Sequence, residues 1–227
     1  MKDSNDIVVE IQKCKTLLSL LPSEQRSLAA HCTSRLLERG EFVFQPGDES
    51  DCLFLLVNGR AVLSHRENGK RAVIESIWPY ELTGQCALVH HGPRAASCEI
   101  VNRATVIRLP LQPIKEAMQT NLQFTNDVLE NVGTAMRQLT YRLVSVLTRP
   151  KRLRLLDVLQ NLAQSHGVET DSGVLLPSGY THQELGEMIG ATRETVTVSL
   201  AELKRDKVID FHGRQVIVLR RPTAEQS

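Results

Sequence analysis

The sequence has 227 residues, 41% of them hydrophobic and 23% charged, and a formal net charge of +1. This length and composition suit one large globular domain or two modest ones. Because the net charge is close to zero, any nucleic-acid binding must depend on local clusters of Lys and Arg. Its five cysteines form no C-x-x-C pair, so they predict neither a disulfide framework nor a metal site. The charged N-terminus and the shortness of the longest apolar run, residues 53–57, argue against secretion and a membrane span, so we expect a cytoplasmic protein without a membrane partner.

The first half of the chain predicts short helices followed by a β-rich region. Residues 15–38 are expected to be helical, with a break before Ser23, which caps the second helix, and to cover the end of a barrel. Six short β-rich segments follow in residues 41–110: FVF, CLFLLV, AVLSH, AVIESIW, AASCEIV and ATVIRL. Turn pairs such as Asn68-Gly69 separate them, since Asn and Gly tolerate the positive φ of tight hairpins. This pattern predicts a β-sandwich or barrel.

A helix of about 25 residues is predicted from Asn121 to Leu147, because apolar residues recur at helical spacing until Pro150 ends the pattern. One apolar seam has coiled-coil spacing and is the predicted dimer interface: Val128, Val132, Ala135, Leu139, Leu143 and Val146. A second stripe lies beside it: Leu129, Met136, Leu143 and Leu147. One stripe can pack on the barrel while the other meets the same helix of a second copy. A long helix buried within a single domain is the alternative.

Another helix is predicted from Lys151 to about Ser165, with Gly167 as its C-cap. Its apolar side is expected to contain Leu153, Leu156, Leu159, Leu162 and Ala163. Residues 168–180 are rich in turn residues.

Residues 181–205 predict two short capped helices joined by a tight turn. Thr181 and Glu184 have the spacing of a capping box, Gly190 supplies a left-handed turn residue, and Thr192 caps the second helix. The inner face of that helix contains Val196, Leu200 and Leu203, and its outer face shows Arg193, Glu194, Thr197 and Lys204. Two helices joined in this way place the second one in a DNA major groove.

The outer face has the chemistry for reading base edges. Arg193 can donate two hydrogen bonds to guanine, and Glu194 can accept one from the amino group of cytosine. Residues 208–219 predict a β-hairpin wing whose tip, Gly213-Arg214, would face the phosphates. An ordinary helical hairpin with a solvated Arg-Glu pair is the alternative, but it does not account for the caps, the turn glycine and the wing together.

The segments HQELGEMIGATRETV and VIDFHGRQVIV resemble the C-terminal domain of the cAMP receptor protein/fumarate-nitrate regulator (CRP/FNR) superfamily, and the resemblance extends over the rest of the chain. It implies that Arg193 and Glu194 read an operator half-site. It also implies that a second group contacts or approaches backbone phosphates: His182, Gln183, Thr192, Thr195, Gly213 and Arg214. Thr197 and Val198 complete the predicted DNA-binding set. Val198 replaces a base-reading arginine of the best-known member, and it can touch a thymine methyl instead.

The resemblance implies an α+β protein built from three parts. These are a cyclic-nucleotide-binding-type β-barrel (a double-stranded β-helix or jelly roll) in residues 1–120, a long dimerisation helix and hinge in residues 121–149, and a winged helix-turn-helix in residues 150–227. It further implies a homodimer on a palindromic operator, with RNA polymerase as a partner if the protein activates transcription. Activation and repression are not distinguished.

The segment LTGQCALVHHGPRAAS, residues 82–97, is similar to the phosphate-binding cassette of this family. The implied ligand-binding residues here are Gly84, Gln85, Cys86, Ala87, Arg94 and Ala95. Gly84 would let the backbone approach an anion, the turn beginning at Gln85 would present amides, and Arg94 would neutralise a phosphate. Arg94 paired with Glu99 on the barrel surface is the alternative.

Two departures from the family pattern leave the effector open. Gln85 replaces a glutamate that accepts a hydrogen bond from ribose, and Arg137 and Gln138 align near the Thr and Ser that hold adenine. A cyclic nucleotide, another small anion such as a cyclic dinucleotide, and no nucleotide at all are all compatible with the sequence.

Specific residues bear on the other possible functions. Cys86, His90, His91 and Cys98 lie close in sequence and would be the ligands of a redox- or haem-sensing variant. A cyclic-nucleotide-binding regulatory subunit acting on a protein partner would leave residues 181–219 without a function. An enzyme is not expected, because the sequence has no G-x-x-x-x-G-K-[ST], H-E-x-x-H or G-x-S-x-G motif.

Overall fold

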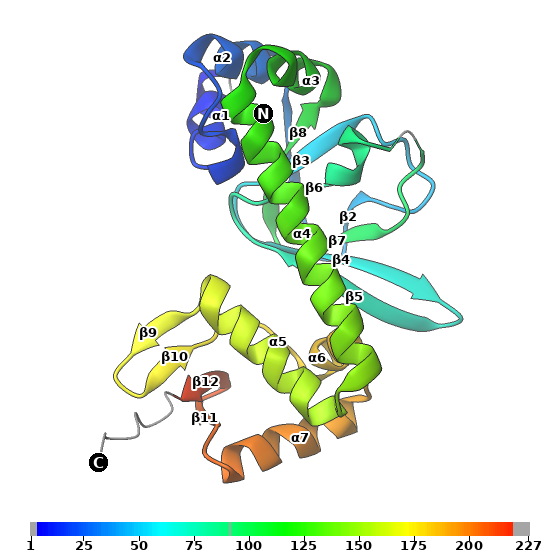
Figure 1. Ribbon diagram of the computed structural model, residues 1–227, viewed down its shortest axis with the longest axis vertical. Coiled ribbons are helices and arrows are strands. Elements are labelled where there is room, and N and C mark those ends of the chain that lie inside the picture. The colour runs from blue at the N-terminus through cyan, green and yellow to red at the C-terminus, as the bar shows by residue number, and fades with distance from the viewer. Residues whose placement is uncertain (1–3, 91, 220–227) are drawn as a thin grey trace. The chain divides into compact units, whose positions relative to one another are not determined.

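The computed structural model describes residues 4–90 and 92–219 (Figure 1). The chain divides into two compact units, residues 1–139 and 140–227, and the division falls within the long helix α4 (Leu122–Thr148). No helix of the described residues has both the length and the apolar character needed to cross a membrane.

Two four-stranded antiparallel sheets form the centre of the N-terminal unit. Their strands are β1 (Thr33–Leu37), β2 (Phe42–Phe44), β3 (Cys52–Leu56), β4 (Arg60–Glu67), β5 (Lys70–Ile77), β6 (Leu82–Thr83), β7 (Ser97–Asn102) and β8 (Ala104–Pro110). One sheet has the order β1-β8-β3-β6 and the other β2-β7-β4-β5. The six predicted strands are present, and Asn68 (φ 50°) and Gly69 (φ 75°) form the turn between β4 and β5, as predicted.

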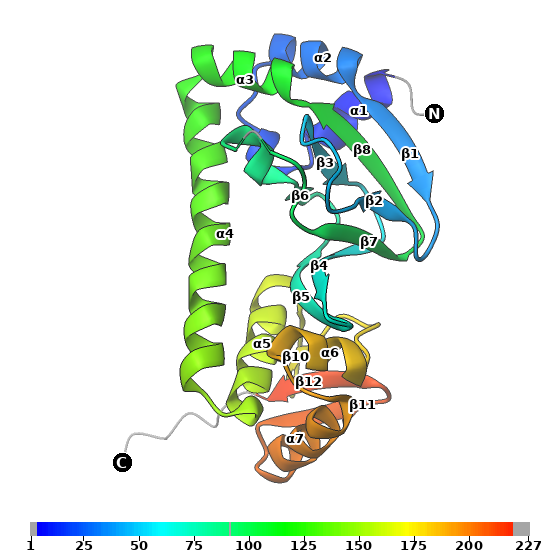
Figure 2. The same cartoon turned by 90° about the vertical axis from the view of Figure 1, so that its right-hand side faces the viewer.

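Short helices cover one end of these sheets, which confirms that part of the prediction. They are α1 (Ser4–Ile11), the 3-10 helix η1 (Lys15–Leu17), α2 (Pro22–His31) and α3 (Leu111–Thr120). Figure 2 shows α2 and α3 side by side where β8 runs into α3. Two local predictions were wrong. Residues 33–37, expected to be helical, form β1, and Leu21 rather than Ser23 caps α2, with its amide donating to Glu24 Oε2 at 2.7 Å.

The apolar run in β3 is buried on both faces. Leu53 and Leu55 pack in a core under the N-terminal helices, while Leu56 and its neighbours pack in a core between the sheets. This explains a strand without polar alternation, because neither face meets solvent. The first turns of α4 join the helical core, where Phe124 and Val128 are both buried.

After the end of α4, the described part of the C-terminal unit contains three helices and a four-stranded sheet. Its elements are α5 (Lys151–His166), β9 (Val168–Thr170), β10 (Gly173–Leu175), α6 (His182–Ile189), α7 (Arg193–Arg205), β11 (Ile209–His212) and β12 (Gln215–Leu219). The sheet order is β11-β12-β10-β9, so the predicted wing, β11-β12, is extended by a second hairpin. The turn-rich residues 168–180 contain the two short strands of this second hairpin.

Helix α5 buries a slightly different face from the predicted one. Leu155 is 0% exposed, whereas Leu153 is 39% exposed. Gly167 is the C-cap, as predicted, but its φ of −76° is not left-handed. Glycine is needed there for space, because a β-carbon would lie 2.3 Å from Val174 Cγ1 and 2.4 Å from the Ala163 carbonyl oxygen.

The junction of α4 and α5 is held by Arg154. Its guanidinium donates to the carbonyl oxygens of Val146, of Arg149 at 2.8 Å and of Ile189 at 3.3 Å, so it connects the end of α4 to the end of α6. On the same junction Asp157 accepts hydrogen bonds from Ser145 (2.9 Å) and Arg149 (2.6 Å).

Candidate nucleic-acid interface and effector cassette

The caps and the turn predicted for the helix-turn-helix are confirmed. Thr181 Oγ1 accepts a hydrogen bond from the Glu184 amide at 3.1 Å, and Thr192 Oγ1 accepts one from the Thr195 amide at 3.2 Å. Gly190 ends α6 in the left-handed conformation (φ 66°, ψ 43°). Each helix start is thus fixed by a threonine, and the turn by the residue that adopts positive φ at the lowest cost.

Close packing at the turn depends on a glycine that the sequence analysis did not single out. A β-carbon on Gly186 would lie 2.6 Å from the carbonyl oxygen of Ala191, so α6 and the turn approach each other only because this residue has no side chain. The signal in the sequence was a second glycine, four residues before Gly190 and inside an apolar helix. Helix α7 is anchored by its inner face, where Val196, Leu200 and Leu203 are buried as predicted.

The outer face of α7 is accessible at its first turns. Arg193, Glu194, Thr197 and Val198 are all exposed. The pKa of the Glu194 carboxyl is lowered by its own backbone amide, by the Thr192 hydroxyl and by the charge of Arg193. Glu194 is therefore a carboxylate at neutral pH, which is the form that accepts a hydrogen bond from a cytosine amino group.

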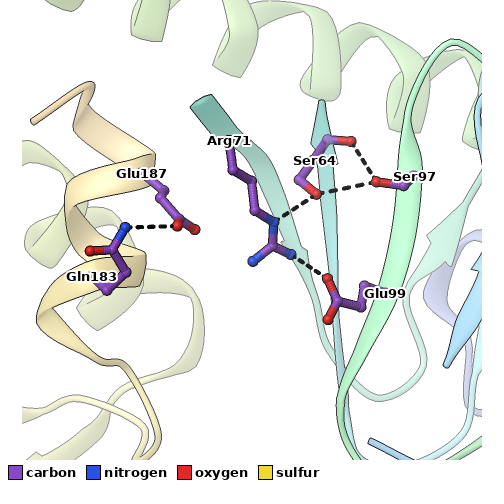
Figure 3. A network of polar contacts seen from close by, with 6 residues as sticks. All are labelled: Ser64, Arg71, Ser97, Glu99, Gln183 and Glu187. Carbon is purple, nitrogen blue, oxygen red and sulfur yellow. Dashed lines mark hydrogen bonds and ion pairs between the residues drawn. The ribbon is translucent and has the colours of Figure 1, made fainter. Parts of the chain in front are cut away.

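The predicted phosphate contacts lie on α6, on the start of α7 and on the wing. His182 Nδ1 lies 2.8 Å from Thr197 Oγ1, so it joins the two helices. Gln183 donates to Glu187 Oε1 at 2.9 Å along α6, as drawn in Figure 3. At the wing tip Gly213 has a φ of 61° and Arg214 is exposed.

In the N-terminal unit the cassette is a left-handed glycine followed by one helical turn. Gly84 has a φ of 89°, and the 3-10 helix η2 (Gln85–Leu88) begins at the next residue. Arg94 is only 6% exposed. It donates to the carbonyl oxygens of Gly84 (3.1 Å) and Cys52 (2.5 Å), and its Cζ lies 4.6 Å from the ring centroid of Phe44. The cassette is thus built around a buried guanidinium.

The alternative for Arg94, a surface pair with Glu99, is wrong. Glu99 pairs with Arg71 instead, at 2.9 Å from Nη2 to Oε2, and Arg71 Nε donates to Ser64 Oγ at 3.1 Å (Figure 3). Ser97 donates to the Ser64 carbonyl oxygen at 3.0 Å and completes this network across β4, β5 and β7.

Helix α4 meets the cassette through a residue that the sequence analysis did not identify. Gln85 Nε2 donates to Asn131 Oδ1 at 3.3 Å and to the Leu82 carbonyl oxygen at 2.8 Å. Arg137 and Gln138, expected near the ligand, lie on exposed positions further along α4.

The residues named for the redox or haem variant differ in their exposure. Burial raises the pKa of the Cys98 thiol to about 12, which disfavours the thiolate that a metal ligand requires. Cys86 and His90 are exposed, and His91 lies outside the described residues. In residues 4–90 and 92–219, no group of three or more His, Cys, Asp or Glu side chains could hold a metal ion.

A β-sheet unit that carries the Gly84–Arg94 cassette, joined by a long helix to a winged helix-turn-helix, defines a DNA-binding transcription regulator with a sensor domain. Residues 34–121 match the cyclic nucleotide-binding domain family, and residues 153–224 match the Crp-like helix-turn-helix domain family. The chain belongs to the CRP/FNR superfamily.

Similar proteins are regulators of this kind. The global nitrogen regulator of Synechococcus elongatus is 25% identical over 184 residues, which is 80% of this chain and 83% of that protein. The CRP-like cAMP-activated global transcriptional regulator of Mycobacterium tuberculosis is 21% identical over 79% of this chain and 81% of its own. Among solved structures, the c-di-GMP responsive regulator CLP of Xanthomonas campestris has a TM-score of 0.69 at 18% identity, covering 85% of this chain and 96% of that one. A CooA variant from Carboxydothermus hydrogenoformans has a TM-score of 0.72 at 18% identity, over 84% of both chains.

Proposed function

We propose that the protein is a homodimeric transcription regulator that binds a palindromic operator through α7 and whose operator affinity is set by an effector at the cassette. The observation that carries the proposal is the Arg193-Glu194 corner, which is exposed at the capped start of a helix whose opposite face is buried. A helix presented in this way can enter a major groove without rearrangement of the unit that holds it.

The dimer is supported by an apolar heptad stripe on α4. Val128, predicted to meet a second helix, is instead only 5% exposed in the core of its own unit. The stripe proposed to meet a partner combines residues of both predicted stripes, with alternating spacings of three and four residues: Leu129, Val132, Met136, Leu139, Leu143 and Val146. Met136 on this stripe is 70% exposed, and a parallel coiled coil within residues 121–149 would bury it. A helix enclosed by its own domain would not expose such a stripe.

The effector is proposed to be a small anion, a cyclic nucleotide being one example. Arg94 Nε is buried and has no hydrogen-bond partner among the described residues, so the guanidinium keeps donor capacity for a ligand. An anion that draws Arg94 away from the Gly84 carbonyl oxygen breaks the hydrogen bond that holds Gly84. Gly84 precedes Gln85, whose side chain donates a hydrogen bond to Asn131 of α4, so the change can reach the long helix. Relatives are named for cAMP and for c-di-GMP, so the likeness does not choose between these effectors. If the regulator activates transcription, RNA polymerase is its further partner.

Selection from a randomised duplex library with the full chain tests the proposal. Rounds run without effector and with cAMP, cGMP, cyclic di-GMP or 2-oxoglutarate should yield a palindromic sequence whose retention falls steeply with salt. Melting temperatures with the same compounds identify the effector, because a ligand that binds the folded state raises the melting temperature. A protein that binds a cyclic nucleotide and no duplex would be a regulatory subunit instead.

A further inference from the structure

We infer that α7 reads thymine methyl groups beside the base pair that Arg193 and Glu194 contact, through Thr197 and Val198. The inference rests on the proposed function and adds the kind of half-site that the helix selects. It concerns the middle of the recognition helix.

The outer face of α7 changes its chemistry along its length. Glu194, Thr197, Val198 and Ala201 follow one another at spacings of three, one and three residues, and all four are exposed. Residues with this spacing share one face of a helix. Val198 is 58% exposed although its side chain is wholly apolar. The face therefore begins with charged groups and continues with methyl groups.

The hydroxyl of Thr197 is already engaged within the protein. It donates to the Arg193 carbonyl oxygen at 3.0 Å, four residues earlier in the helix, and lies 2.8 Å from His182 Nδ1. A hydroxyl has a single hydrogen, so donation to Arg193 leaves none for a base, and His182 then acts as the donor to Thr197 Oγ1. The two contacts also fix the side-chain rotamer. Thr197 can therefore offer DNA no donor, but it keeps one acceptor lone pair and a methyl group that is held in one position.

DNA offers one apolar group in the major groove, the C5 methyl of thymine. The methyl groups of Thr197 and Val198 can be buried only against that group, because the other base edges present hydrogen-bonding atoms. Burial of one methyl-sized group contributes about a fourfold gain in affinity. We therefore expect A·T pairs next to the pair contacted by Arg193 and Glu194, with their thymine methyls towards α7.

The test uses the duplex recovered by library selection, with each thymine replaced in turn by deoxyuridine, which lacks only the C5 methyl. The native chain should lose about fourfold in affinity at one or two thymines adjacent to the pair that Arg193→Ala ceases to discriminate. Thr197→Ser keeps the hydroxyl and removes the methyl, so it should lose this thymine preference at one position. Thr197→Val keeps methyl groups and removes the hydroxyl, so it should retain the preference. Val198→Ala should lose the preference at a neighbouring position.

Thr148→Ser is the matched control, because Thr148 also donates to a carbonyl oxygen four residues earlier, that of Val144 at 2.8 Å, and lies outside the helix-turn-helix. At every thymine, this variant should show the same ratio of affinities for the thymine and deoxyuridine duplexes as the native chain. Equal affinity for thymine and deoxyuridine duplexes at all positions would overturn the inference and leave the proposed function intact. So would loss of the preference in Thr197→Val with retention in Thr197→Ser, because the hydroxyl would then be the reading group. Failure to recover any selected sequence would overturn both.

Discussion

The guanidinium of Arg94 donates a hydrogen bond to the carbonyl oxygen of Gly84 at 3.1 Å, and a β-carbon on Gly84 would lie 2.6 Å from the same nitrogen. The two residues are thus closely fitted to each other. Arg94 is part of the fold of the cassette as well as its cationic group.

Replacement of Arg94 by Ala should therefore destabilise the N-terminal unit, contrary to the expectation for a residue that acts only on a ligand. Loss of two charged hydrogen bonds in a buried setting is expected to lower the free energy of unfolding by about 3 kcal/mol. The fluorescence of Trp78, the only tryptophan in the sequence, reports denaturant unfolding of this unit. Arg103→Ala is the control, since Arg103 forms an exposed pair with Glu38 and should contribute roughly 0–1 kcal/mol. Equal stability of the two variants would contradict a structural role for Arg94.

Glu81 should make the N-terminal unit less stable as the pH rises towards neutrality. Burial raises the pKa of this carboxyl from 4.5 to about 7, with the Trp78 amide opposing and Glu75 adding to the shift. The folded state therefore favours the protonated form, and the stabilisation is full below pH 4.5 and is lost as the pH rises through about 7. Glu81→Gln is neutral at every pH, so it should melt at a higher temperature than the native chain above pH 7. Below pH 7 its melting temperature should not show the fall with rising pH that Glu81 causes in the native chain.

Glu41→Gln is the matched control for Glu81. Glu41 accepts a hydrogen bond from the Glu38 amide in the way that Glu81 accepts one from Trp78, but it is exposed. The melting temperature of this variant should follow the native pH profile. A native-like slope in Glu81→Gln would assign the pH dependence to other groups.

Arg193→Ala should weaken specific binding by about 1–3 kcal/mol, with the loss confined to one base pair per half-site. Competition binding against duplexes substituted at each position measures both quantities. Arg205→Ala, on the exposed last turn of the same helix, is the control. A loss spread evenly over all sequences would make Arg193 a phosphate contact and not a base-reading residue.

Met136→Lys should convert the dimer into a monomer while the subunit stays folded, because the side chain is exposed within one chain and buried only in the proposed coiled coil. Sedimentation equilibrium measures the change in mass, and circular dichroism checks the helix content. Thr134→Lys, on another exposed face of α4, should leave the mass unchanged. A Met136→Lys dimer as tight as the native one would place the interface elsewhere.

The parts of this protein that local chemistry determines were predictable from the sequence. The caps at Thr181 and Thr192 and the turn at Gly190 each depend on residues within four positions. Threonine is a preferred N-cap residue and glycine a preferred left-handed C-cap residue, so the residue types alone predict these conformations. The parts that long-range pairing determines were not. Strand β1 has an exposed, irregular pattern and exists because it pairs with β8, where Thr33 faces Arg108.

The errors at the cassette and in α4 have a similar cause. The burial of Arg94 depends on Phe44 and Phe54, which come from two other strands. On α4 both Val128 and Leu129 are apolar, and only the position of the N-terminal core decides which one is buried. Periodicity identifies such stripes but does not say which neighbour each one meets.

The contacts of Arg154 bear on how a movement of the long helix is transmitted. Because one side chain holds carbonyl oxygens from the end of α4 and from the last residue of α6, a rotation of that end about its axis turns the DNA-reading motif by a similar amount. Pro150 interrupts the helical hydrogen bonding between α4 and α5, but the break is not a free joint, because Arg154 bridges it.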